Sequence, residues 1–545
     1  MTTKDDWFEV FTIADLIVRA AKAHPQRVAV TFPEESRTYA ELLDNAISVA
    51  RGLLALGVKP GNHVGIMSAN CPEFIEGLLG ASMLGCVVVP INARHKASEI
   101  GYIVENADLV ALLTTAEENE YTSFTRLFTE ALPTLGSASD PAALSLPEAP
   151  ALRATVLLKG QGRQGFIDFQ NFQALADTVA AEEVQQLRQR VRTQDTALIV
   201  YTSGTTANPK GCMLTHEAVV RGSVYRARTI FATEAHHKAW NPGPLFHIAA
   251  LAPFLGVMGV MGTYVADKYF DPGRAVALME REQVDMIWPW FPAIVQGVLD
   301  HPDFDPQRLQ SVRKVMLIGP PALVRRVQAT FPGAEIFQAC GMTETSGIFA
   351  ITKAGETEEQ RAHTQGQPCA GVEVRIASLS GEGDAAAGEV GEILVRAYCV
   401  MQRYYKDPQK TAETLDDQGW LHTGDLYLRR PDGSLVFNGR LKDMLKVGGE
   451  NVAAIEIEAF LSEHPAVKTA EVIGKPDPRL DEVPVAFVEL RPGQAATAED
   501  LIGFCKDRIS SYKVPREIYF MQPGTWPMSA TKVNKRALRE RLELH

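Results

Sequence analysis

Segments with the pattern of strands alternate with segments that have the pattern of helices, and this order constrains the fold more than any other feature. His63–Met67 has a strand pattern, Pro72–Gly85 a helical one and Cys86–Pro90 a strand pattern again, and the alternation resumes from Thr196 to about Ala350. Strands that alternate with helices form parallel sheets covered by helices. The sequence therefore predicts an α/β fold class.

The C-terminal part of the chain changes in character. From about residue 352 to 441, short apolar runs are separated by Gly and Asp-Gly turns, which predicts a β-rich subdomain. Residues 442–545 return to mixed helical and strand patterns, which predicts a small α+β domain. We expect a large N-terminal domain, residues 1–441, that includes the β-rich subdomain, and a C-terminal domain, residues 442–545. A chain of 545 residues is too long for a single core.

Charge and cysteine usage exclude several classes of protein. The net charge is −12 and both signs are mixed along the chain, whereas a nucleic-acid binder needs a basic face. The seven cysteines include no C-x-x-C pair, so neither a disulfide framework nor a zinc ribbon is indicated. The N-terminal residues lack the apolar run of a signal peptide. We expect a cytoplasmic protein that binds no nucleic acid.

One uncharged stretch, Leu245–Ala266, is long enough to cross a bilayer. It contains His247, Pro253 and three glycines, and an apolar run of this kind is equally compatible with a soluble core. We interpret it as a buried helix followed by a strand, so we expect no membrane span.

Residues 131–165 are rich in Ala, Pro, Ser and Gly, which predicts an excursion over the surface. Within them, Gly160, Gly162 and Gly165 match the G-x-G-x-x-G pattern of dinucleotide sites. The residues that follow alternate like a strand and do not begin a helix, so the strand–turn–helix context of such sites is missing. We interpret this match as a loop.

A second glycine-containing segment has the chemistry of a phosphate-binding loop. It follows the apolar strand Ala197–Val200 and lacks the Gly-Lys-Ser order of a Walker loop. Backbone N–H groups beside glycines, hydroxyl groups and a lysine all bind phosphate oxygens. A polar surface turn needs no such density of hydroxyls directly after a buried strand. The predicted phosphate ligands are Thr202, Ser203, Gly204, Thr205, Thr206 and Lys210.

Six segments, in this order and with this spacing, resemble the acyl-activating superfamily of adenylating enzymes, which includes acyl-CoA synthetases, the adenylation domains of peptide synthetases, and luciferases. The resemblance covers nearly the whole chain. The segments are Thr202–Gly211, Gly341–Glu344, Gly419–Asp425, Gly439–Asp443, Val447–Asn451 and the terminal Lys532.

The resemblance implies an AMP-forming acyl-CoA synthetase that uses ATP, Mg²⁺ and coenzyme A. Glu344 is a carboxylate in a Gly-containing turn, which suits a magnesium ligand, although a helix-capping acid has the same local pattern. Thr343 would donate to the α-phosphate. Asp425 would accept the ribose hydroxyls, with an Asx-turn residue as the alternative, and Arg440 would reinforce ribose or phosphate contacts.

The resemblance also implies motion of the C-terminal domain. Lys532 would be the catalytic lysine of adenylation, although its polar surroundings alone are typical of a solvated lysine. The domain would then rotate about a hinge at Lys442 and bring Gly448 and Gly449 to line a tunnel for the thiol. Hinges of this kind lie at the junctions of elements.

The acyl pocket is expected from His247, Ala250, Trp290 and Gly341, and the adenine pocket from Gly319 and Pro320. The pocket residues are apolar, aromatic or small, which predicts a short-to-medium or aromatic carboxylate without a free amino group. Three positions depart from the family pattern. The aromatic residue expected before Gly341 is Cys340, a Gly-Gly-Ala turn is replaced by Gly319-Pro320-Pro321, and the glycine expected before Lys532 is Thr531.

The sequence leaves open other acyl acceptors and other classes of protein. An adenylating enzyme could load its acyl or amino acid onto a carrier protein, but an aspartate to recognise an α-amino group is missing near His247, and no carrier domain follows His545. A luciferase-type oxygenase and a non-catalytic nucleotide-binding regulator are further alternatives, although a regulator has no need of Glu344 or Lys532. The sequence leaves a homodimer open.

Overall fold

The computed structural model describes residues 11–117, 123–202, 209–231, 237–381, 383–447, 450–506, 508–529 and 532–543. The chain divides into two compact units. The first comprises residues 1–362, 368–373 and 396–419, and the second comprises residues 363–367, 374–395 and 420–545.

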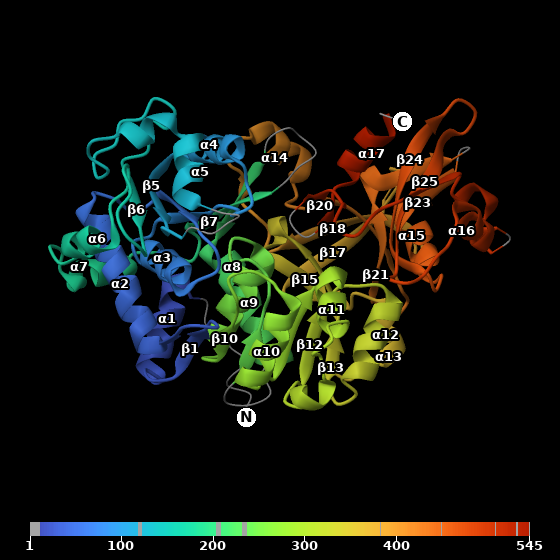
Figure 1. The fold of residues 1–545 in the computed structure, drawn as a ribbon, viewed down its shortest axis with the longest axis horizontal. Coiled ribbons are helices and arrows are strands. Elements are labelled where there is room, and N and C mark those ends of the chain that lie inside the picture. Colours follow the sequence, from blue (N-terminus) through green and yellow to red (C-terminus); the bar gives the residue numbers. More distant parts are fainter. Residues whose placement is uncertain are drawn as a thin grey trace. The chain divides into compact units, whose positions relative to one another are not determined.

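A seven-stranded sheet in the first unit has the order β6-β5-β3-β4-β7-β8-β19. Its strands β5, β6 and β7 are labelled in Figure 1. The strands from β6 to β7 run parallel, and β8 and β19 are antiparallel additions at one edge. The strands are β3 (His63–Met67), β4 (Val87–Pro90), β5 (Leu109–Thr114), β6 (Ala154–Leu157), β7 (Thr196–Thr202), β8 (Lys210–Thr215) and β19 (Arg403–Tyr404).

A second seven-stranded sheet of the same unit has the order β13-β12-β11-β9-β10-β1-β2. All neighbours are parallel except β1 and β2, which are antiparallel. Its strands are β1 (Val28–Thr31), β2 (Ser36–Thr38), β9 (Lys238–Trp240), β10 (Thr263–Val265), β11 (Met286–Trp290), β12 (Lys314–Leu317) and β13 (Glu335–Phe337). A separate three-stranded sheet of order β14-β15-β16 follows β13; β14 (Ala339–Met342) and β15 (Gly347–Ile351) are antiparallel, and β16 (Gln367–Pro368) lies beside β15.

Local sequence explains where the helices begin. Thr38 accepts a hydrogen bond from Glu41 N and the Glu41 carboxylate accepts from Thr38 N, a capping box that starts α2. Pro72 stands at the first turn of α3, where its missing N–H costs nothing, and α3 is buried along its whole length. The helices of this part are α1 (Ile13–Ala23), α2 (Tyr39–Ala55), α3 (Pro72–Met83), α4 (Ala97–Asn106), α5 (Phe124–Ala131), α6 (Phe169–Ala176), α7 (Ala181–Arg188), α8 (His216–Arg226), α9 (Ile248–Gly259), α10 (Pro272–Glu282), α11 (Pro292–Leu299), α12 (Pro321–Thr330), α13 (Glu358–His363) and α14 (Pro408–Thr414).

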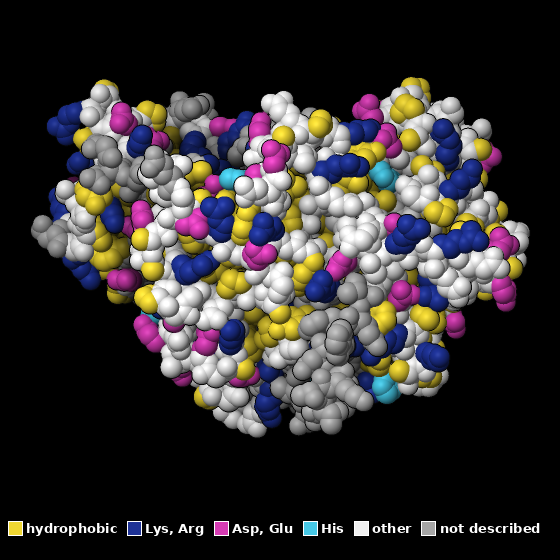
Figure 2. Space-filling view, turned by 180° about the vertical axis from the view of Figure 1, so that it is seen from behind, with side chains coloured by type: hydrophobic (Ala, Val, Ile, Leu, Met, Phe, Trp, Pro, Cys, Tyr) yellow, Lys and Arg dark blue, Asp and Glu magenta, His cyan; other side chains and the backbone are white. Residues whose placement is uncertain are grey.

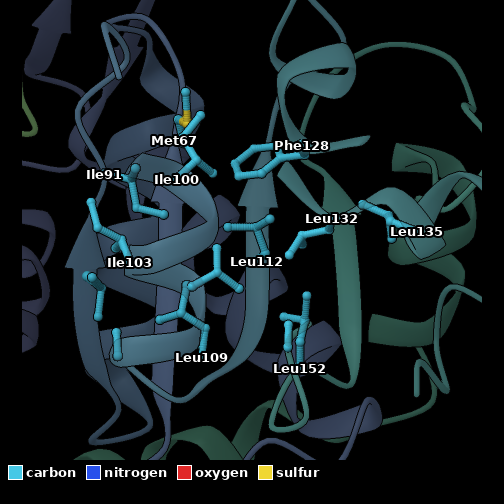
Figure 3. Close-up of a cluster of buried hydrophobic side chains, with 14 of the residues drawn as sticks. Met67, Ile91, Ile100, Ile103, Leu109, Leu112, Phe128, Leu132, Leu135 and Leu152 are labelled. Atoms are coloured by element: carbon cyan, nitrogen blue, oxygen red, sulfur yellow. The ribbon is translucent and has the colours of Figure 1, made fainter. Parts of the chain in front are cut away.

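The core against the first sheet includes residues from the segment that we expected to lie on the surface. Figure 3 shows Leu135 and Leu152 among buried side chains from β3, α4, β5 and α5. Residues 154–157 of the same segment form β6, at the edge of the sheet. The surface excursion predicted for residues 131–165 was therefore wrong, because widely spaced leucines in a small-residue background bury as well as a continuous apolar run.

The glycine-rich match within that segment is a loop, as predicted, but a helix does follow it. Ile167 forms a parallel bridge with Val156, and the Asp168 carboxylate caps α6 by accepting a hydrogen bond from Asn171 N. The expectation that no helix begins there was wrong, because the cap lies beyond the strand-like residues.

The second unit is built on antiparallel pairing. A four-stranded sheet has the order β17-β18-β20-β21, and a five-stranded sheet has the order β23-β22-β25-β24, with β26 beside β25. Its strands are β17 (Val372–Ser378), β18 (Val390–Ala397), β20 (Leu421–Arg429), β21 (Leu435–Arg440), β22 (Met444–Val447), β23 (Glu450–Ala453), β24 (Val467–Asp477), β25 (Asp481–Leu490), β26 (Glu517–Phe520), β27 (Met528–Ser529) and β28 (Lys532–Val533). Its helices are α15 (Ala454–Ser462), α16 (Ala498–Cys505) and α17 (Lys535–Glu543).

The predicted fold class is confirmed, with parallel sheets and covering helices before a smaller antiparallel part. The uncharged stretch Leu245–Ala266 forms the buried helix α9 and the strand β10, as expected. In the part of the chain that the structure describes, none of the helices is both long enough and apolar enough to cross a membrane. On the face seen in Figure 2, acidic and basic side chains are interspersed.

Candidate active site

Three neighbouring parallel strands of the second sheet end beside one another. β9 leads into the loop before His247, β11 ends at Trp290, and β12 leads to Gly319 and Pro320. The carboxyl ends of parallel strands meet at one edge of a sheet, which is where α/β proteins place their ligands. The structure therefore brings the predicted acyl and adenine residues to one edge.

Two buried asparagines, which the sequence analysis missed, shape the loop that leads to His247. Asn241 Oδ1 accepts a hydrogen bond from Gly243 N over 2.7 Å. Asn70 Nδ2 donates to Gly243 O over 2.9 Å, and its Oδ1 accepts from Leu245 N over 2.7 Å. These bonds satisfy polar backbone groups in a buried loop. His247 then occupies the N-cap position of α9, where its backbone O accepts hydrogen bonds from Ala250 N and Leu251 N.

The hairpin that carries Gly341 packs closely on itself and lies beside α9. A β-carbon added to Gly341 would lie 2.2 Å from Gly347 O, so only glycine fits there. One added to Gly347 would lie 3.6 Å from Ala252 and 3.9 Å from Ile248, both on α9. Ala250, on the same helix, is fully buried. Gly341 and the start of α9 thus lie close together, as the predicted acyl pocket requires.

Gln338 connects the adenine-side loop to the strand that precedes Gly341. Its Oε1 accepts a hydrogen bond from Gly319 N over 3.2 Å, and its Nε2 donates to Arg361 O over 2.9 Å and to Ala362 O over 3.2 Å. The side chain is fully buried. Cys340, the predicted departure from the family pattern, is buried in β14 two residues further on.

Glu344 lies in a short 3-10 turn, Thr343–Thr345, and is 8% exposed. The Tyr404 hydroxyl donates a hydrogen bond to Glu344 Oε1 over 2.7 Å, and no described residue hydrogen-bonds to the other carboxylate oxygen, Oε2. The Lys210 ammonium lies 5.7 Å from the centre of the Tyr404 ring. Pairing of β19 with β8, with Tyr404 opposite Cys212, brings these groups together.

The electrostatics of this cluster suit an anion. Burial and the neighbouring Lys410 ammonium, on α14, both lower the pKa of Lys210. Burial and the Glu344 carboxylate raise the pKa of the Tyr404 hydroxyl, so it remains a donor at any ordinary pH. A polyphosphate placed between Lys210 and Lys410 would relieve their mutual repulsion. Sequence reasoning missed Tyr404 and Lys410, which carry no motif of their own.

The predicted phosphate loop joins β7 to β8. Thr202 and Lys210 stand opposite each other at its base, as the last cross-strand pair of the hairpin. The other predicted phosphate ligands, Ser203, Gly204, Thr205 and Thr206, lie outside the described residues, as do Gly448 and Gly449.

The remaining predicted residues belong to the second unit. Arg440 Nε lies 3.1 Å from Asp425 Oδ1, on the neighbouring strands β21 and β20. The Asp425 N–H donates to Thr423 Oγ1 over 3.0 Å. Lys442 lies in a 3-10 turn, Leu441–Asp443, between β21 and β22, where burial and Arg440 lower its pKa. For Lys532 only the backbone is described, in β28 beside β27.

Comparison with known families agrees with this arrangement. Residues 17–405 match the family of AMP-binding enzymes, and residues 456–531 match the C-terminal domain of the same enzymes. The chain belongs to the AMP-binding enzyme family. The resemblance predicted from the six motifs is thereby confirmed.

Relatives of this AMP-binding enzyme include curated acyl-CoA ligases. The chain is 31% identical, over 97% of both chains, to a putative acyl-CoA synthetase of Bacillus subtilis. It is 32% identical to a methyl-dioxo-octahydroindenyl-propanoyl:CoA ligase of Rhodococcus jostii, over 97% of this chain and 98% of that one.

Solved structures give the same picture. An anthranilate CoA ligase in complex with anthranoyl-AMP superposes with a TM-score of 0.85 at 25% identity, covering 100% of this chain and 99% of that one. An o-succinylbenzoate CoA synthetase of Bacillus subtilis, bound to its acyl-adenylate, gives a TM-score of 0.78 at 25% identity, covering 96% and 97%. The predicted enzyme class, an AMP-forming acyl-CoA synthetase, is confirmed.

Proposed function

We propose that this AMP-binding enzyme uses ATP, Mg²⁺ and coenzyme A to activate a short-to-medium or aromatic carboxylate without a free amino group. The binding of ATP and Mg²⁺ is supported by one observation, the cluster of Glu344, Tyr404 and Lys210 beside the base of the phosphate loop. The buried carboxylate accepts a hydrogen bond from Tyr404, and the ammonium group lies over the ring of the same tyrosine. A carboxylate and an ammonium group around one side chain suit a magnesium triphosphate.

A carboxylate is a poor acyl donor because its leaving group would be oxide. Attack of its oxygen on the α-phosphorus of ATP turns that oxygen into part of AMP, with pyrophosphate as leaving group. Such a reaction needs positioning and neutralisation of charge rather than a protein nucleophile. Lys210 and the loop hydroxyls would hold the pyrophosphate portion, and Thr343 would donate to the α-phosphate. A thiolate then attacks the acyl carbon and releases AMP.

Glu344 fits a magnesium ion as one ligand of a larger set. Tyr404 hydrogen-bonds to Oε1, and Oε2 is the oxygen that a cation would contact. No three His, Cys, Asp or Glu side chains gather into a metal site within the described ranges, so phosphate oxygens and water would complete the shell, as is common for Mg²⁺. The ion would neutralise charge on the phosphates.

The second unit would supply ribose contacts and the moving parts. Asp425 would accept the ribose hydroxyls, with Arg440 holding its carboxylate in place. We propose that residues 442–545 form a mobile domain with its hinge at Lys442, which lies in the turn between the four-stranded and five-stranded sheets. Lys532 would serve adenylation, and Gly448 and Gly449 would serve the thiol.

The acyl pocket at His247, Ala250, Trp290 and Gly341 would exclude an ammonium group. None of these four residues is acidic, and a buried charge without a partner costs several kcal/mol. Two ligases similar to this one act, by their names, on anthranilate and on a bicyclic propanoate, and both of these carboxylates carry a ring. The amino group of anthranilate is an arylamine, which is uncharged near neutral pH and therefore brings no ammonium group into a pocket.

The experiment is a screen of carboxylates for pyrophosphate release, with and without CoA, in a cytoplasmic-type reducing buffer. We expect release with straight-chain, branched or aryl acids, stoichiometric AMP only when CoA is present, and rejection of α-amino acids by about two decades against their deaminated analogues. Equal turnover of an amino acid and its deaminated analogue contradicts the pocket. AMP formation that needs a carrier protein and ignores CoA favours the alternative, an enzyme that loads a carrier. Light scattering on the same sample tests whether the enzyme is a homodimer.

A further inference from the structure

Trp290 has an unusual backbone conformation at the end of β11. Its φ is +56°, a region that bulky side chains rarely adopt. Phe291 N donates to Pro289 O over 2.7 Å, which makes Trp290 the centre of a tight three-residue turn of the rare, strained kind. Ile318 N donates to Trp290 O over 2.6 Å and anchors this turn to the loop that carries Gly319.

The indole of Trp290 is enclosed without a hydrogen-bond partner. The side chain is 5% exposed, and within the described ranges its Nε1 has no acceptor. A buried Trp N–H ordinarily finds one, because leaving it unpaired costs free energy. Three buried amides that hold the loops at this edge, Asn70, Asn241 and Gln338, all make hydrogen bonds through their side chains.

Trp290 combines a strained backbone with a buried N–H that has no acceptor among the described residues. Each of these costs free energy, and such costs persist in a folded protein only where another interaction offsets them. Strained backbone concentrates at ligand sites for this reason. Trp290 stands between the strand that leads to His247 and the strand that leads to Gly319, where the acyl and adenine groups are proposed to meet. The missing acceptor is therefore best supplied by the acid itself.

We infer that Trp290 Nε1 donates a hydrogen bond to an oxygen atom on the acyl portion of the substrate. The inference rests on the proposed function and narrows its substrate class. The preferred acids carry an oxo, hydroxyl or methoxy group in addition to the reacting carboxylate, and plain hydrocarbon acids of the same shape are poorer substrates. A site with a buried donor rejects an analogue that leaves the donor unpaired.

The first test compares matched acids on wild type and on Trp290→Phe, which keeps a large ring and removes the N–H. The pairs are 3-(4-hydroxyphenyl)propanoate with 3-phenylpropanoate, and linear oxo acids with the carbonyl at successive positions against their parent acids. We expect wild type to prefer one or more oxygenated members by about tenfold or more in kcat/KM, which corresponds to one hydrogen bond. Trp290→Phe should lose that preference, so that the ratio of kcat/KM between the two members of the pair approaches one.

Trp288→Phe is the matched control, since Trp288 is also buried on β11 and its ring packs edge-on against Phe231. Trp288→Phe should change kcat/KM by the same factor for both acids of each pair. If Trp290→Phe lowers kcat/KM by the same factor for both acids of a pair, the hydrogen bond from Nε1 goes to the reacting carboxylate, and the inference is overturned. A wild type without preference in any pair would also overturn it. A wild type that forms AMP with neither member contradicts the proposed function as well.

A spectroscopic readout does not depend on turnover. The chain has six tryptophans, so the ¹⁵N-labelled indole N–H resonances are few, and the one absent from Trp290→Phe identifies residue 290. Adding the preferred oxygenated acid with a non-hydrolysable ATP analogue should move this resonance downfield, and the parent acid should not. A resonance that responds alike to both acids overturns the inference.

Discussion

The Tyr404 hydroxyl donates its hydrogen bond to Glu344 Oε1 over 2.7 Å, and this fixes the orientation of the one buried carboxylate in the Gly341–Glu344 motif. The two residues come from distant parts of the chain and meet because β19 pairs with β8. The phenol therefore positions the proposed magnesium ligand.

Tyr404→Phe tests this positioning role. Removing the donor leaves Glu344 buried and unpaired, which costs about 1–3 kcal/mol. We expect the Mg²⁺ concentration for half-maximal pyrophosphate release to rise about tenfold, with the KM for the acid unchanged. Tyr405→Phe is the control, because the Tyr405 hydroxyl donates to Asp108. Identical magnesium titrations for the two variants would remove Tyr404 from the site.

Gln338→Met tests the support of the adenine-side loop. The substitution keeps the volume but leaves Gly319 N without its acceptor and removes the bonds to Arg361 O and Ala362 O. We expect the KM for ATP to rise about tenfold, while the KM for the acid changes less than twofold. Gln328→Met, on α12, is the control, since Gln328 donates to Ala334 O. A rise in both KM values would indicate general loosening and contradict a role specific to the nucleotide.

Gly341→Ala tests the close approach in the β14–β15 hairpin. The new methyl group would lie 2.2 Å from Gly347 O, so the backbone must move. We expect a loss of about 2 kcal/mol in stability, within the range for overpacked sites, and at least a hundredfold loss in adenylation. Gly333→Ala adds a methyl group with no heavy atom within 4 Å, and it should keep wild-type activity and melting temperature. A fully active Gly341→Ala would mean that the hairpin tolerates a wider turn.

The second unit should become less stable as the pH rises through neutrality. Burial and the neighbouring Glu458 raise the pKa of Glu471 from 4.5 to about 7, although Lys535, which contacts both acids, lowers it. Asp443, paired with Arg539, adds a further negative charge. The folded state therefore binds this proton more tightly than the unfolded state. The resulting stability is present below pH 4.5 and is lost as the pH rises through about 7.

Glu471→Gln should remove this dependence. We expect the free energy of unfolding of the variant, relative to that of wild type, to rise by about 2 kcal/mol between pH 5 and pH 8. Urea unfolding of the full chain at both pH values measures this difference. Glu463→Gln replaces an exposed glutamate of the same unit, just beyond α15, and should follow wild type at each pH. If the free energies of unfolding of Glu471→Gln and wild type differ by the same amount at pH 5 and pH 8, the raised pKa assigned to Glu471 is contradicted.

Much of the fold could be predicted from local patterns. The strand expected at His63–Met67 is β3 residue for residue, and the uncharged Leu245–Ala266 folds as a helix and a strand because apolar runs of that length fill a core. The segment around Leu135 and Leu152 was misjudged because its buried leucines are too widely spaced to form a periodic pattern. Periodicity predicts elements, and it does not predict how isolated side chains reach a core.

Candidate site residues could be predicted from the sequence where they belong to a motif. Residues that only the tertiary structure brings to the site could not be predicted. Thr202, Lys210 and Glu344 could be predicted as site residues because glycines and hydroxyls mark their turns. Tyr404 and Lys410 carry no such mark. The pairing of β19 with β8 reveals Tyr404, and Lys410, on α14, is recognised because its charge lowers the pKa of Lys210. The backbone of Trp290 runs against the preference of a bulky residue, so no propensity argument could have predicted it.

A carboxylate oxygen that attacks the α-phosphorus of ATP must leave with AMP, and the most direct measurement follows that oxygen. A carboxylic acid labelled with ¹⁸O in both carboxylate positions is converted with ATP and CoA by the wild-type enzyme, and the products are analysed by mass spectrometry. We expect one ¹⁸O atom in AMP, one in the thioester carbonyl and none in pyrophosphate. Label in inorganic phosphate with formation of ADP, or AMP without label, would contradict it.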